Sequence, residues 1–127
     1  MTAISMTPFK AIHHASMIVS DLEKSLFFYC DILGLVINDS RPDFKFAGAW
    51  LNINETQQIH LLQIENPDST ERPEHGGRDR HTALIARDIQ QIETRLNQAN
   101  IHFTKSQSGR SALFCRDPDG NTLEIME

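Results

Sequence analysis

Two short phrases of this sequence open with a histidine and follow one pattern. Residues 14–22 and residues 81–89 each continue as an apolar run and carry an aspartate seven positions after the histidine. A second pair of matched phrases comes later in each half, where His60 and Glu124 stand inside apolar segments. This internal repeat places three imidazoles and one carboxylate at equivalent positions. It indicates a duplicated module with a metal site, because these groups are ligands for divalent first-row metals.

We predict that one divalent ion, which would be zinc, nickel, iron, manganese or cobalt, is held by His14, His60, His81 and Glu124. A lone histidine in a strand is usually structural, so the repeat carries the prediction. His13 competes with His14 for the first position, but only His14 shows the spacing to aspartate that His81 also has. His60 would face away from the site if the register of its strand shifted by one residue. Glu124 can hold an ion and also accept a proton, and we predict it as the catalytic base.

The elements that position these groups are expected in the same order in both halves. In the first half, residues 12–19 form an apolar run that predicts a strand, and Ser20 with Glu23 predicts the capping box of a helix. Gly34 occupies the position expected just past the end of that helix. Three more strands are then expected, over residues 35–39, 44–52 and 58–64.

The second half repeats this order. Residues 80–86 predict a strand, Asp88 predicts the N-cap of a helix, and Asn100 takes the place that Gly34 has in the first half. The remaining strands are expected over residues 101–105, 112–116 and 121–126. Both halves therefore predict β-α-β-β-β, in the α+β class. If two such modules pair through a pseudo-twofold axis, their mixed sheets curl into a cup and equivalent positions converge on its floor.

The length of 127 residues fits one domain with its own core. We expect a flexible tail over residues 1–10 and a single domain over residues 11–127. This domain would consist of modules 11–65 and 80–127, joined by the proline-, glycine- and charge-rich loop 66–79.

The composition of the chain limits the kinds of molecule that it is expected to bind. The net charge of −5 argues against a nucleic-acid-binding protein, which would normally show a basic face. No apolar run has the length of a membrane span, and the first residues do not resemble a signal peptide. The expected partner is therefore a small molecule, the expected location is cytoplasmic, and Cys30 and Cys115 are expected as free thiols.

Several other side chains allow two interpretations. Phe44, Phe46 and Trp50 alternate along one predicted strand, so they either line an apolar pocket or pack in the core. His75 and His102 have no equivalents in the other half and are expected on the surface. An anionic substrate would need cationic partners, and the spacing does not identify which residues bind it. The available cations are Arg41, Arg78, Lys105 and Arg110.

Two groups of motifs at opposite ends of the chain carry a resemblance to a known superfamily. The first group consists of His14, Asp21-Leu22, Phe28-Tyr29 and Leu33-Gly34-Leu35, and the second consists of Asp117-Pro118-Asp119-Gly120-Asn121 followed by Leu123-Glu124. Together they resemble the opening and closing signatures of the vicinal oxygen chelate proteins, which include glyoxalase I, bleomycin-resistance proteins and extradiol dioxygenases. The resemblance spans about residues 11–127.

The resemblance implies paired βαβββ modules, often assembled as homodimers, around a metal ion whose open positions bind two adjacent substrate oxygens. It implies that His14, His81 and Glu124 match the usual ligands. His60 stands where glyoxalase I proteins commonly have a glutamate, and histidine is the poorer base, which leaves Glu124 as the main candidate. The site would lie within one chain or across two.

The implied activity is that of a metal-dependent, glyoxalase-like lyase or isomerase. It would act on a small α-hydroxycarbonyl or hemithioacetal through a metal-stabilised enediolate. One alternative is a ring-cleaving dioxygenase, since His14, His81 and Glu124 alone form the two-histidine, one-carboxylate set of non-haem iron sites. Another is metal-dependent thiol transfer to an epoxide, and a third is a non-catalytic resistance protein that binds a small molecule.

Overall fold

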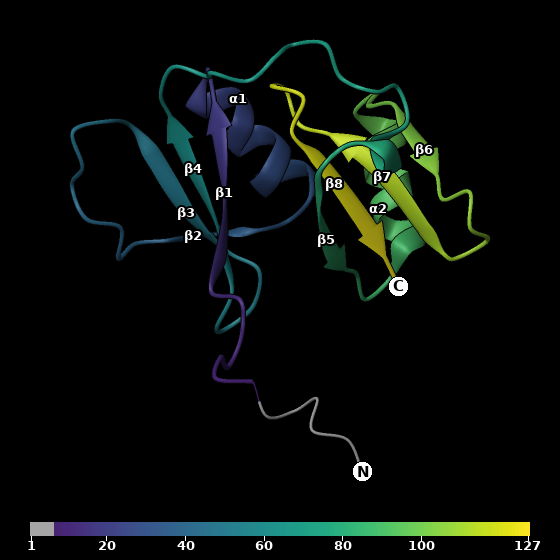
Figure 1. Cartoon of the computed structure of the whole chain (residues 1–127), viewed down its shortest axis with the longest axis horizontal. Helices are drawn as coiled ribbons and strands as arrows, with labels where there is room; N and C mark the ends of the chain where they lie inside the picture. Colours follow the sequence, from purple (N-terminus) through teal and green to yellow (C-terminus); the bar gives the residue numbers. More distant parts are fainter. Residues whose placement is uncertain (1–6) are drawn as a thin grey trace.

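The computed structural model describes residues 7–127 and contains two four-stranded mixed sheets, one in each half of the chain (Figure 1). The first sheet has the order β1-β4-β3-β2 and consists of β1 (His14–Val19), β2 (Val36–Asn38), β3 (Gly48–Asn52) and β4 (Gln58–Gln63). The second has the order β5-β8-β7-β6 and consists of β5 (His81–Ile85), β6 (Phe103–Lys105), β7 (Ala112–Arg116) and β8 (Thr122–Met126). The two orders are equivalent, so the predicted pair of βαβββ modules is confirmed.

Both modules use one register between their first and last strands, which lie parallel. In the first sheet, the residue two positions after His14 pairs with His60. In the second sheet, the residue two positions after His81 pairs with Glu124. Because side chains alternate between the faces of a strand, each histidine of a first strand shares a face with the predicted ligand of the last strand. The four residues therefore form two structurally equivalent pairs.

One helical segment in each module follows its first strand. In the first module, α1 (Leu22–Leu26) continues into a π-helical segment, η2 (Phe27–Ile32). In the second module, α2 (Ile89–Gln98) begins as predicted at Asp88, whose carboxylate accepts from the backbone N–H groups of the second and third residues after it. None of the helices in the described part of the chain is long and apolar enough to cross a membrane.

The predicted N-cap of the first helix was one residue too early. Asp21, and not Ser20, caps α1, since its carboxylate accepts from the Lys24 N–H at 3.3 Å. The Ser20 N–H instead donates to the Asp119 carboxylate of the other module at 3.0 Å. Both helices end as predicted, with Gly34 at φ +87° and Asn100 at φ +57°, a left-handed conformation that glycine and asparagine tolerate best. Ser20 thus takes part in a contact between the modules through its backbone N–H group, while Asp21 caps the helix.

A single apolar core joins the two modules. The largest side chains with almost no exposed surface come from both halves and include Tyr29, Leu51, Ile59, Leu96 and Leu123. The Tyr29 hydroxyl donates to the Asp117 carboxylate at 2.7 Å, across 88 positions of sequence. Burial, followed by the nearby Asp117 charge, raises the pKa of Tyr29, and burial raises the pKa of Asp117. This buried bond fixes one module against the other.

The third strand is shorter than residues 44–52. β3 begins at Gly48, because the chain before it turns: the Phe44 N–H donates to the Pro42 carbonyl at 3.0 Å. The Phe46 carbonyl accepts from the Arg41 guanidinium at 2.9 Å and takes no part in the sheet. The prediction that these aromatic side chains continue one strand is therefore wrong for residues 44–47.

The connection between the modules is packed on the second sheet. It crosses from the first module to the second and includes a 3-10 helix, η3 (Gly76–Arg78) (Figure 1). A Cβ atom added at the buried Gly76 would lie 2.6 Å from the Thr122 Cγ2 atom and 2.9 Å from the Phe114 Cβ atom. The close approach of the connection to β7 and β8 thus requires glycine.

Candidate metal centre

The first pair consists of His14 on β1 and His60 on β4. Their rings stack with centroids 3.8 Å apart and planes 9° apart. His60 is 8% exposed, and its Nε2 lies 2.7 Å from the Gln58 Oε1 atom. Because an amide oxygen only accepts, Nε2 carries the hydrogen in this arrangement and Nδ1 carries the lone pair.

The surroundings of His60 favour the uncharged form of its imidazole ring. Burial, followed by the nearby His14, His13 and Arg41 groups, lowers the pKa of His60 to about 4. At neutral pH the His60 imidazole is therefore uncharged, and an uncharged imidazole is the form that binds a metal. The His13 Nδ1 atom lies 2.8 Å from the His14 Nδ1 atom, and the His13 ring lies 6.4 Å from the His60 ring, farther away than the His14 ring.

An aromatic wall extends from His60 to Trp50 on β3 and on to Phe44 and Phe46 in the loop before β3. Trp50 stacks on His60 with centroids 4.5 Å apart, and Phe44 lies 6.4 Å from Trp50 and 5.5 Å from Phe46. The Arg41 guanidinium lies 4.9 Å from the Phe44 ring. None of the three aromatic residues is buried, so they form a surface next to the histidine pair and do not pack in the core.

The second pair consists of His81 on β5 and Glu124 on β8. The His81 Nε2 atom lies 3.2 Å from the Glu124 Oε1 atom, and Glu124 is 5% exposed. The Arg110 guanidinium donates to the Glu124 Oε2 atom at 2.7 Å from the loop before β7. Phe114 meets the His81 ring edge-on, with centroids 5.2 Å apart. A buried carboxylate here has one histidine and one arginine as partners.

Within one chain the two pairs stay separate. Among residues 7–127 no group of three or more histidine, cysteine, aspartate or glutamate side chains is placed to hold an ion. Of the two possibilities left by the sequence, a site within one chain and a site across two, the separation of the pairs favours the second. The assignment of His14, His60, His81 and Glu124 as ligands stays a prediction.

The donor chemistry of both pairs fits a divalent ion. Two ligand atoms that each lie about 2.0–2.2 Å from one ion are about 3 Å apart, which is close to the separation of the His81 and Glu124 atoms. The cysteines do not add to this donor set, since burial raises the pKa of the Cys115 thiol to about 12 and the Cys30 thiol lies in the helical segment. The two pairs thus supply three imidazoles and one carboxylate.

Sequence patterns missed part of this arrangement. Arg110 is one of the four cations that the sequence offers to a substrate, and nothing in its spacing indicates its contact with Glu124. His75 was expected on the surface, but its Nδ1 lies 2.8 Å from the Thr104 hydroxyl and it is only partly exposed, whereas His102 is exposed as predicted. Lys105 pairs with Glu93 at 2.6 Å and does not reach the second pair. These contacts join distant residues, so no local signal reveals them.

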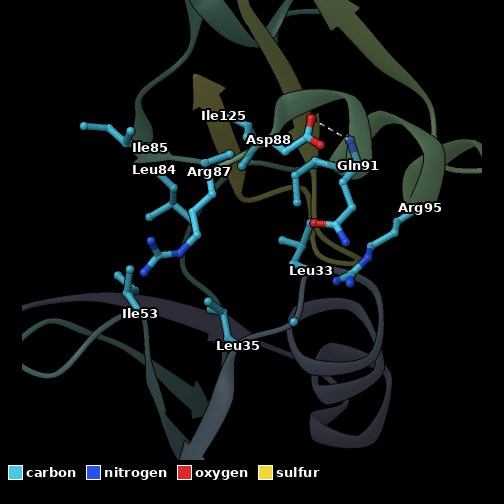
Figure 2. Close-up of a pocket in the computed structure, with 13 residues that line it drawn as sticks. Leu33, Leu35, Ile53, Leu84, Ile85, Arg87, Asp88, Gln91, Arg95 and Ile125 are labelled. Atoms are coloured by element: carbon cyan, nitrogen blue, oxygen red, sulfur yellow. Dashed lines mark hydrogen bonds between the residues drawn. The ribbon is translucent and has the colours of Figure 1, made fainter. Parts of the chain in front are cut away.

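Several cavities are lined by residues of both modules, and two of them share Ile53, Leu84 and Ile85. The cavity in Figure 2 is lined by Leu33, Leu35 and Ile53 of the first module and by Leu84, Arg87, Arg95 and Ile125 of the second, and it contains none of the predicted ligands. A neighbouring cavity is lined by His13 and His14 on one side and by residues 82–85 of β5 on the other. Beside it, Ile12 and Ile85 are 74% and 81% exposed. The open edges of β1 and β5 therefore present apolar side chains next to His14.

The sequence and the fold of this chain are similar to those of known proteins. The model of the Glyoxalase/Bleomycin resistance protein/Dioxygenase superfamily matches residues 11–125. A lactoylglutathione lyase of Haemophilus influenzae is 26% identical over 123 residues, which cover 91% of each chain. A metallothiol transferase, FosB, of Staphylococcus saprophyticus is 29% identical over 91% of this chain and 76% of its own. The crystal structure of a lactoylglutathione lyase from Agrobacterium tumefaciens has the same fold, with a TM-score of 0.65, 21% identity and 94% of each chain covered.

Proposed function

Because this chain belongs to the Glyoxalase/Bleomycin resistance protein/Dioxygenase superfamily, we propose that it is a metal-dependent lyase or isomerase of glyoxalase type. Its substrate would be a small α-hydroxycarbonyl or hemithioacetal. The observation that carries the proposal is the repeated pair: His14 with His60 and His81 with Glu124, at one register in two modules. A repeat built only for packing would not need imidazoles and a buried carboxylate at those four places.

We further propose that each site forms between two copies of the chain. His14 and His60 of one copy would meet His81 and Glu124 of the other, around one zinc, nickel, iron, manganese or cobalt ion. The separation of the two pairs within a chain supports this arrangement, as do the exposed Ile12 and Ile85 side chains beside them. A twofold dimer built in this way contains two sites.

The bound ion would supply Lewis-acid stabilisation of negative charge on the substrate oxygens. Glu124 would take a proton from the carbon next to the carbonyl and return it to the adjacent carbon. Its Oε2 atom is held at 2.7 Å by Arg110, so the carboxylate is fixed in direction before the substrate arrives. The Trp50 and Phe44 wall would exclude water from one side of the substrate.

The first test is the metal content of the untagged protein by plasma mass spectrometry, with a glyoxalase assay on methylglyoxal and a thiol. We expect about one ion per chain, lost in His14→Ala and Glu124→Ala and kept in the control His102→Ala, which changes an exposed histidine outside both pairs. Glu124→Gln should reduce turnover by about 10²–10⁴-fold. Full turnover in Glu124→Gln, or no ion after reconstitution, would overturn the proposal.

Metal-dependent thiol transfer is the second candidate, favoured by the similarity to the metallothiol transferase FosB. Manganese-dependent consumption of an epoxide such as fosfomycin, with a thiol as co-substrate, would select it. The dioxygenase alternative rests on His14, His81 and Glu124 as a two-histidine, one-carboxylate set, and iron-dependent oxygen uptake with a catechol would select it. The proposal places the enzyme in the reducing cytoplasm, in line with the free Cys30 and Cys115 thiols.

A further inference from the structure

Three flat rings of the first module lie nearly parallel in one row that ends at Trp50. The ring centroids are 3.8 Å apart between His14 and His60 and 4.5 Å apart between His60 and Trp50, and the planes of the two pairs differ by 9° and 8°. Trp50 is the single tryptophan of the chain, and it is partly exposed directly beside the histidine pair. Because aromatic rings attract one another at such spacings, a further planar ring can bind at the exposed part of Trp50.

The second module has an aromatic residue at the equivalent position, but there it is covered. Trp50 pairs with His60 across β3 and β4, and Phe114 pairs with Glu124 across β7 and β8. Phe114 is 7% exposed, because the connection lies against it: a Cβ atom added at Gly77 would lie 3.2 Å from the Phe114 Cζ atom. The same position is therefore closed by the chain itself in one module and left partly open in the other.

Phe44, Phe46 and Arg41 extend this open position away from the histidines. The Phe44 and Phe46 rings stack with centroids 5.5 Å apart and planes 8° apart, and Phe44 lies 6.4 Å from Trp50. The Arg41 guanidinium lies 4.9 Å and 5.4 Å from the two phenyl centroids and donates to the Phe46 carbonyl. A Cβ atom added at Gly48 would lie 2.9 Å from the Arg41 Nη2 atom, so the guanidinium is held against β3, the strand that carries Trp50.

The charge of Arg41 is not compensated by a carboxylate. Among residues 7–127, Arg41 takes part in no ion pair, whereas four other arginines do: Arg72, Arg80, Arg110 and Arg116. Its partners are two aromatic faces and one carbonyl oxygen, which hold the cation in place without neutralising it. A cation placed in this way favours an anionic group on a bound molecule.

We infer that Trp50, Phe44 and Arg41 form the part of the substrate site that recognises a planar aromatic group with a negatively charged substituent. The ring of the substrate would lie on Trp50 and Phe44, and its negative charge would meet Arg41. The assignment to the substrate site rests on the proposed function, and it selects aromatic, anionic compounds among the α-hydroxycarbonyls and hemithioacetals. Binding of such a group to the wall itself requires no metal ion, because all of these side chains belong to the first module.

The first test measures the binding of benzoate to the metal-free protein through tryptophan fluorescence, which reports on Trp50 alone. We expect a saturable change in emission with benzoate. Cyclohexanecarboxylate carries the same charge without the flat ring and should bind about 2- to 10-fold more weakly. Benzamide has the ring without the charge and should bind about 2- to 5-fold more weakly.

Three variants assign the binding to the wall. Phe44→Leu keeps an apolar side chain but removes a ring, and it should lower the affinity for benzoate to about that for cyclohexanecarboxylate. The matched control is Phe27→Leu, which changes a ring of similar exposure on η2, 56% against 44% for Phe44, and should leave the affinity unchanged. Arg41→Gln should lower the affinity for benzoate and leave the affinity for benzamide unchanged.

Equal affinities of the wild type for benzoate and cyclohexanecarboxylate would overturn the inference. An unchanged affinity for benzoate in Phe44→Leu would also overturn it, as would an equal fall for benzoate and benzamide in Arg41→Gln. A wild type that binds benzoate as expected but holds no metal after reconstitution would refute the proposed function and leave the aromatic-anion site in place. A wild type that holds metal and turns over the hemithioacetal of methylglyoxal, but shows no saturable change with benzoate, would refute this inference alone.

Discussion

Mixing two inactive variants should restore metal sites if each site forms between two copies of the chain. His14→Ala removes a ligand of the first pair, and His81→Ala removes a ligand of the second. Both residues are exposed, so neither substitution disturbs the core. In a dimer of either variant alone, each of the two sites lacks one histidine. In a mixed dimer, one site lacks both histidines and the other is intact.

The fraction of sites that should recover follows from the arrangement of the two pairs in a mixed dimer. Random pairing of equal amounts gives about half mixed dimers, each with one intact site of two, so about one quarter of all sites should recover. The two variants are unfolded together and refolded as a mixture, and native mass spectrometry then counts the mixed dimers. Metal content and turnover should both reach about a quarter of the wild-type value. A site within one chain would give no recovery at all, because no chain in the mixture has all four ligands.

The reasoning is refuted if mixed dimers form in the expected proportion and neither metal nor turnover recovers. It is also refuted if the metal-loaded wild type is a monomer. Refolding each variant separately before mixing is the control, since recovery should then appear only as subunits exchange.

Three further predictions concern stability. In the metal-free protein, His60 has a pKa of about 4 in the native state and about 6.5 in the unfolded chain, so between these pH values only the unfolded chain binds a proton there. The free energy of unfolding should therefore fall, by at most about 3 kcal/mol, as the pH is lowered from about 6.5 to about 4. Urea titrations should show this loss reduced in His60→Gln; an equal loss would contradict the shift. Tyr29→Phe removes the buried bond to Asp117 and should lower the free energy of unfolding by about 1.5–3 kcal/mol, and a neutral effect would contradict the bond. Gly76→Ala places a Cβ atom 2.6 Å from the Thr122 side chain and should lower the free energy of unfolding by about 1–3 kcal/mol, measured by thermal unfolding. An unchanged midpoint would contradict the close packing of the connection on the second sheet.

Local patterns predicted the modules well, because strands and caps depend on near neighbours. Asp88 as N-cap and the asparagine at residue 100 were sufficient to place the two ends of α2. Where two good caps stand side by side, as Ser20 and Asp21 do, a local pattern does not choose between them, and the contact of Ser20 with the distant Asp119 is not visible in it either. The strand over residues 44–52 was too long because a turn at Pro42 redirects the chain.

The site was predicted as four residues and found as two pairs. The repeat identified His14, His60, His81 and Glu124 because equivalent positions in a duplicated module share a register. How the two modules face each other depends on the packing of helices and sheets around Tyr29 and on contacts between distant residues, which no periodicity encodes. For the same reason the contacts of Asp79 with Arg72 and Arg116, which are 7 and 37 positions away, could not be seen in the sequence.

The shared core has a consequence for the origin of this chain. A single βαβββ module would leave the side chains that meet Tyr29 and Leu96 open to water, so a half-length ancestor would be stable only when paired with a copy of itself. Fusion of two such genes would make that pairing permanent. After the fusion, each module could acquire substitutions that the other module does not have. His60 and Glu124 stand at one equivalent position with different side chains, and a homodimer of identical modules could not have that difference.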